Sequence, residues 1–190
     1  MALPDSAKYV DGTSFIFAFD TDWPASPTQG WSATVDGEID LGGLANGGYH
    51  QSVKVDLTAN RDVEYKVEVS VETEADATAG GTIDVYYYTS DSATVGIGNM
   101  GGCSGADAAY TGGTGGTAAT GIKMLEYAGP LVLQATAAAD AEPQIGVVGM
   151  IRPAGRYLGI VVGNNSGTAL ATTADECAIR VTGQNLQLQD

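Results

Sequence analysis

The chain has 190 residues, and its 8 Lys or Arg against 23 Asp or Glu give a net charge of −15. This charge repels the phosphates of DNA and RNA, so we expect no nucleic-acid partner. No apolar run approaches the roughly 20 residues that cross a bilayer, and the first residues lack a secretory leader, so we expect no membrane partner and assembly in a cytoplasm. The length is typical of one well-filled domain, taken as residues 1–190.

Apolar and polar residues alternate with a period of two in many segments, which decides the fold class. The pattern is clearest at 64–74, where Tyr65, Val67 and Val69 face one way and the intervening polar residues face the other. Strands are predicted at 15–19, 49–57, 64–74, 82–89, 130–137, 144–151, 156–162 and 176–182. Eight strands without a helical repeat predict an all-β, two-sheet antiparallel β-sandwich that is jelly-roll-like and has long loops.

Three stretches do not fit a strand pattern. Residues 1–14 form a predicted N-terminal arm, and residues 20–48, with two prolines and both tryptophans, predict a long loop with one short strand near 31–35. Residues 96–121 hold ten glycines among Ala, Thr and Ser, a composition that buries little apolar area. We therefore expect this insert and the arm to be ordered only by neighbouring subunits.

Candidate catalytic residues are few. His50 is the single histidine and lies on the polar face of a predicted strand, without a Gly-x-Ser-x-Gly elbow or another nucleophile motif in the chain. We interpret His50 as a solvated strand residue, and we expect no catalytic residue and no cofactor. Acidic residues are plentiful, so a carboxylate-based hydrolase remains a weaker candidate.

The same scarcity of ligands argues against a metal centre. One histidine and two separated cysteines, Cys103 and Cys177, do not make a structural zinc site, and we expect two unpaired thiols, with one disulfide as the alternative. Asp36, Glu38 and Asp40 share one side of an extended stretch and offer oxygens to calcium. Their spacing differs from that of the twelve-residue calcium loop, so a solvated acidic face is expected instead.

Aromatic residues are the candidates for binding. We expect Phe15, Trp23, Trp31 and Tyr110 at an interface, because aromatic rings anchor protein contacts with a small loss of entropy. The alternative use of the two tryptophans and the tyrosines is a platform on which sugar rings stack.

The order of segments resembles the small jelly-roll capsid cement or decoration proteins of tailed bacteriophages. The resemblance covers residues 39–182 and departs from the family in the long N-terminal extension and the glycine-rich insert. The segments that carry it are Ile39-Asp40-Leu41-Gly42, Gly81-Thr82-Ile83-Asp84-Val85, Thr89-Ser90-Asp91, Gly155-Arg156-Tyr157-Leu158-Gly159-Ile160-Val161-Val162, the turn at 163–167 and the closing strand at 177–181.

The resemblance implies a non-enzymatic virion structural protein that binds the outer surface of a phage head and stabilises it. Its implied partners are the major capsid protein and further copies of itself, as a dimer or trimer. Its implied location is the capsid surface, after assembly in the host cytoplasm. The alternative from another class is a carbohydrate- or receptor-binding module of a tail fibre or an extracellular enzyme.

Overall fold

The computed structural model describes residues 8–57, 62–135, 143–172 and 177–187, and these residues are nearly all β-structure. The helical segments within them are short: α1 (Ala118–Gly121) and the 3-10 turns η2 (Met100–Gly102) and η3 (Ile122–Met124). The strands are β1 (Lys8–Ala18), β2 (Gly37–Glu38), β3 (Tyr49–Gln51), β4 (Val55–Asp56), β5 (Glu64–Val71), β6 (Thr82–Ser90), β7 (Ala108–Ala109), β8 (Glu126–Val132), β9 (Gln144–Ile151), β10 (Tyr157–Asn165) and β11 (Ala178–Gln187).

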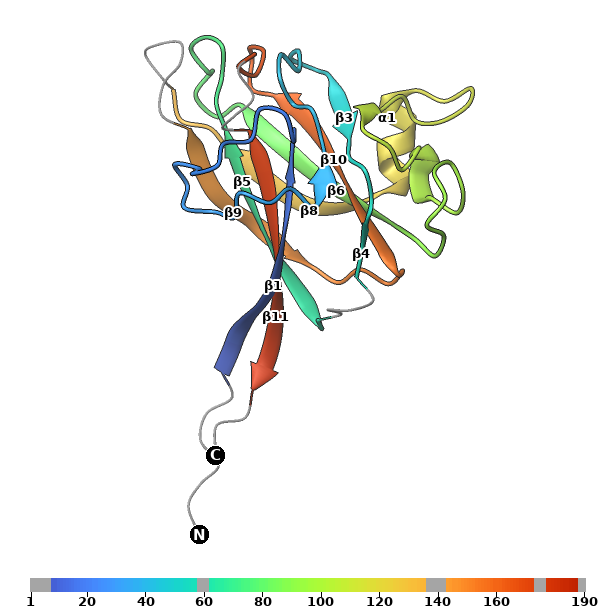
Figure 1. Cartoon of the computed structure of the whole chain (residues 1–190). Helices are drawn as coiled ribbons and strands as arrows, with labels where there is room; N and C mark the ends of the chain where they lie inside the picture. Colours follow the sequence, from blue (N-terminus) through green and yellow to red (C-terminus); the bar gives the residue numbers. More distant parts are fainter. Residues whose placement is uncertain (1–7, 58–61, 136–142, 173–176, 188–190) are drawn as a thin grey trace.

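The strands form two sheets that pack face to face (Figure 1). One sheet has the order β2-β1-β11-β5-β9, and the other has the order β7-β3-β10-β6-β8, with β4 also paired to β10. If the short β2 and β7 are left out and β3 and β4 are counted as one interrupted strand, eight strands remain. When these eight are numbered along the chain, the first sheet has the order 1-8-3-6 and the second has the order 2-7-4-5. This interleaving of first and last strands is that of a jelly roll, and the predicted all-β sandwich is confirmed.

The core lies between the sheets and follows the predicted alternation. On β5, Tyr65, Val67 and Val69 are buried while Lys66 and Glu68 lie on the outer face. β11 and β9 flank β5 in antiparallel register. Ile179 and Val181 of β11 and Ile151 of β9 lie opposite the core residues of β5, whereas the exposed large apolar residues of β9 lie opposite its outer-face residues.

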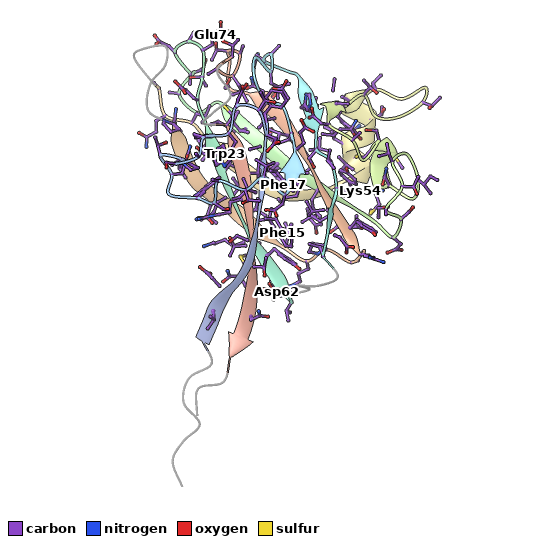
Figure 2. The ribbon with its side chains drawn as sticks, in the orientation of Figure 1. Phe15, Phe17, Trp23, Lys54, Asp62 and Glu74 are labelled. Carbon is purple, nitrogen blue, oxygen red and sulfur yellow. The ribbon has the colours of Figure 1, made fainter. Side chains whose placement is uncertain are left out.

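The end of strand β1, residues 15–18, differs from a half-solvated strand because both of its faces are covered. Phe15 and Phe17 enter the core between the sheets, as Figure 2 shows, and Ile16 and Ala18 on the opposite face are also buried. The loop that follows β1 supplies this second cover. Successive side chains of β1 therefore face two different apolar environments, the core between the sheets and the contact with the long loop.

The N-terminal arm is partly a strand. Residues 8–11 pair with residues 184–187 of β11, and this ribbon extends from one end of the sandwich (Figure 1). The expectation that all of residues 1–14 are ordered by neighbouring subunits is therefore wrong for residues 8–14, because β11 supplies their backbone partners. Residues 1–7 lie outside the described residues.

The short strand of the long loop lies later than predicted. Instead of residues 31–35, Gly37 and Glu38 form β2, parallel to the end of β1. A carboxylate oxygen of Asp36 accepts a hydrogen bond from the backbone N–H of Ile16 at 2.8 Å, which brings the loop to β1 at this point.

Candidate functional site

The tryptophans expected at an interface are part of the subunit's own fold. Trp23 and Trp31 are each only 7% exposed, and their ring centroids are 6.3 Å apart over Ile16 and Ala18. The indole N–H of Trp23 donates to the carbonyl of Ser32 at 2.9 Å. The two rings therefore leave little surface for a partner protein or a stacked sugar.

Phe15 and Tyr110, the other two aromatic residues expected at an interface, are also buried. Phe15 lies in the core between the sheets. Tyr110 belongs to a cluster on the outer face of the second sheet, where its hydroxyl donates to the carbonyl of Gly101 at 2.6 Å. All four candidate residues thus stabilise the monomer, and an interface must use other side chains.

The glycine-rich insert packs on its own sheet. Cys103, Tyr110 and Leu125 cover Tyr88 and Val161 of the second sheet. The expectation that residues 96–121 require a neighbouring subunit is therefore wrong. A few widely spaced apolar side chains supply enough burial, and the glycines between them hide this pattern in the sequence.

A buried lysine fastens the start of the insert. Lys54, labelled in Figure 2, is 9% exposed, and its ammonium donates to the Asn99 side-chain oxygen at 2.8 Å and to the Thr94 carbonyl at 2.9 Å. Weaker bonds reach the Ile97 carbonyl and the Ser90 hydroxyl. Desolvation by burial lowers the pKa of Lys54. Lys54 lies within the strand predicted at 49–57, and only the folded chain shows what covers its side chain.

Replacing Lys54 with Met is expected to lower the free energy of unfolding by roughly 1–3 kcal/mol, because buried carbonyls lose their donor. Residues 91–99 should also become more sensitive to protease. Urea unfolding and limited proteolysis measure both effects. Lys66→Met is the matched control, since Lys66 is a more exposed lysine 3.5 Å from Glu68 and such surface pairs contribute about 0–1 kcal/mol. Equal effects of the two substitutions would contradict this role of Lys54.

His50 is paired with an acid that the insert provides. Its Nε2 lies 2.8 Å from a carboxylate oxygen of Asp107, which also accepts the backbone N–H of Asp40 at 2.9 Å. His50 is therefore half-buried rather than solvated. No Ser, Thr or Cys side chain in the described ranges is hydrogen-bonded to the imidazole. The pair holds the insert against β3.

The predicted metal candidates have structural contacts instead. Asp36 accepts the N–H of Ile16, and Asp40 accepts the N–H of Gly42 at 2.9 Å. Within the part of the chain that the structure describes, no three His, Cys, Asp or Glu residues gather as metal ligands. Cys103 and Cys177 are both buried and are not joined to each other: Cys103 lies under the insert, and Cys177 lies in the core between the sheets.

An exposed apolar strip lies where the two sheets meet at one side. We define the apolar strip as Val132 of β8 with Ile145, Val147 and Met150 of β9, whose side chains are 49–60% exposed. β8 and β9 are the edge strands of their sheets. Residues 127–135 and 143–151 contain no charged side chain.

The two strands of the strip, β8 and β9, approach each other closely. Gly129 has a φ of 146°, and a side-chain carbon there would lie 2.1 Å from the carbonyl oxygen of Val148. At one end of the strip, Leu131, Val132, Gln144 and Ile145 line part of a cavity of about 300 Å³. β8 carries Pro130, the kind of residue that keeps an edge strand from pairing with another strand, but a contiguous exposed apolar patch still marks an interaction site. The strip is therefore the candidate functional surface, and nothing in the sequence pattern had distinguished it from core strands.

No helix among the described residues is long and apolar enough to span a membrane. Comparison with protein-family models, with curated proteins and with solved structures found no match.

Proposed function

We propose that this chain is a non-enzymatic virion structural protein that decorates the outer surface of a tailed-phage head and stabilises it. The observation that carries the proposal is the uncharged apolar strip on a protein with a net charge of −15. The centre of a protein interface is depleted of charged residues and rich in apolar ones. The strip has this composition, whereas much of the remaining surface is acidic and suited to solvent.

The architecture supports the same role. Viral capsid proteins are among the proteins that use jelly rolls. The ribbon of β1 and β11 extends beyond the sandwich and offers a second contact to the shell or to another copy (Figure 1). The partners in this proposal are the major capsid protein and further copies of this chain, as a dimer or trimer.

Stabilisation follows from mass action. A protein that binds the assembled shell, and not its dissociated subunits, adds RT ln(1 + [L]/Kd) per site. The gain is about 2.7 kcal/mol at a hundredfold excess over Kd, and a shell repeats it at many sites. The surface need only bind, so the proposal requires no chemistry from His50 or the carboxylates.

Val147→Glu is expected to weaken binding to phage heads by on the order of 100-fold, because the substitution buries an unpaired carboxylate in the contact. Heads from a strain that lacks this chain are incubated with purified protein and sedimented, and the bound fraction is measured. Val95→Glu is the matched control, since Val95 is 58% exposed against 60% for Val147 and lies outside the strip. Circular dichroism and thermal unfolding verify that both variants fold.

Decorated heads should also rupture at a higher temperature than bare heads, as measured by release of packaged DNA. Equal binding by Val147→Glu and the wild type would remove the strip from the contact. Equal rupture temperatures of bare and decorated heads would overturn the stabilising function itself.

A further inference from the structure

The outer face of the second sheet is only partly covered by the insert, and three tyrosines lie at the border of that cover. Tyr127 is 52% exposed, and Tyr49 and Tyr86 are half-buried. The rings of Tyr86 and Tyr127 lie 5.0 Å apart between centroids at an interplanar angle of 45°. We define the tyrosine platform as these three residues together with Asp84 and Asn165.

Strand register brings the platform together from four strands that lie side by side in Figure 1. Tyr49 on β3 is opposite Gly163 on β10, which is opposite Asp84 on β6. A side-chain carbon at Gly163 would lie 2.6 Å from the ring of Tyr49, so only glycine lets that ring lie across β10. On the next strand, β8, Tyr127 pairs with Tyr86 beyond the register shift.

The polar groups of the platform are held in place by one another. One carboxylate oxygen of Asp84 accepts the hydroxyl of Tyr127 at 2.9 Å, and the other accepts the side-chain amide of Asn165 at 2.7 Å. A carboxylate offers about four lone-pair positions, so Asp84 keeps acceptor capacity for a ligand. Asn165 is exposed and keeps its amide oxygen and a second N–H.

We propose that the tyrosine platform binds a neutral saccharide, with a sugar ring stacked on Tyr127 and its hydroxyls bonded to Asp84 and Asn165. A pyranose has an apolar C–H face and a rim of hydroxyl groups, which matches aromatic faces beside fixed polar groups. The net charge of −15 and the Asp84 carboxylate disfavour nucleic acids, anionic lipids and acidic sugars. The site does not depend on the proposed head decoration and shares no residue with the apolar strip, although Tyr127 and Val132 both lie on the outer face of β8. It uses none of the tryptophans first considered for sugar stacking.

The test uses the purified full chain on an array of neutral and acidic oligosaccharides, followed by titration calorimetry with the strongest neutral binder. We expect binding to neutral glycans, with affinity reduced about tenfold or more in Tyr127→Ala. Tyr127→Phe should retain most of the affinity because the stacking face remains. Asp84→Asn should weaken binding through loss of a charged acceptor.

Met124→Ala is the matched control, because Met124 is 65% exposed outside the platform and its loss should leave affinity unchanged. Thermal unfolding of each variant separates loss of the site from loss of the fold. Three results would each overturn the proposal. They are the absence of binding to any neutral glycan, binding confined to acidic glycans, and equal affinity of Tyr127→Ala and the wild type. Because the assay contains no phage heads, its failure would leave the decoration proposal standing, and the reverse also holds.

Discussion

Between pH 9 and pH 12 the protein is expected to lose stability steeply and to unfold. Burial under the insert raises the pKa of Cys103 from 9.0 to about 12 and that of Tyr110 from 10.0 to about 12, and it raises the pKa of Tyr88 as well. Below pH 9 both the folded and the unfolded chain hold these protons, so the groups add no pH dependence. Above their ordinary pKa the unfolded chain releases protons that the folded chain retains, which favours unfolding.

Each such group contributes a slope of about 1.4 kcal/mol per pH unit, against a total stability of about 5–15 kcal/mol for an ordinary domain. Absorbance of ionised tyrosine and far-UV circular dichroism, recorded together against pH, should therefore change in one cooperative step. Tyr110→Phe should lower the slope of stability against pH in this window. Gradual ionisation near pH 10 with an unchanged circular dichroism spectrum would contradict the expected burial of this cluster.

Phe17→Ala is expected to lower the free energy of unfolding by about 3–5 kcal/mol. Phe17 is fully buried between the sheets, and the ring packs so closely on β2 that a side-chain carbon at Gly37 would lie 2.5 Å from it. Removing the ring leaves a cavity that neighbouring strands cannot fill. For a chain of this size the midpoint of thermal unfolding should fall by roughly 6–20 °C.

Phe19→Ala is the matched control for this substitution. Phe19 follows two residues later, just after the end of β1, and is only half-buried. Urea unfolding at pH 7 should show a clearly smaller loss for Phe19→Ala than for Phe17→Ala. Equal losses would mean that Phe17 does not occupy the centre of the core.

The molecule has two candidate binding surfaces with different chemistry. The apolar strip lies at the junction of the two sheets and suits another protein, whereas the tyrosine platform lies on the outer face of the second sheet and suits a small polar ligand. Neither surface uses the four aromatic residues that composition had indicated. Trp23 and Trp31 hold the long loop on part of the first sheet's outer face, and Tyr110 holds the insert on part of the second sheet's outer face. Phe15 lies in the core between the sheets.

Local sequence was sufficient for the class of fold. Period-two alternation located each of the eight main strands, because a strand's geometry sends successive side chains to opposite faces whatever its neighbours are. Turn residues separated the strands for the same local reason. The starts and ends were less accurate, as the length of β1 shows, because partners such as β11 extend a strand beyond its apolar residues.

Tertiary structure decided which polar and aromatic residues are covered. Lys54 and Asn99 are 45 residues apart, and His50 and Asp107 are 57 apart, so no short pattern joins either pair. Alternation distinguishes the two faces of a strand but does not show whether a distant loop will cover the outer one. The burial of the two tryptophans and of Cys103, and the exposure of the edge at β8 and β9, could not be predicted for this reason. Burial is set by contacts between segments that only the folded chain brings together.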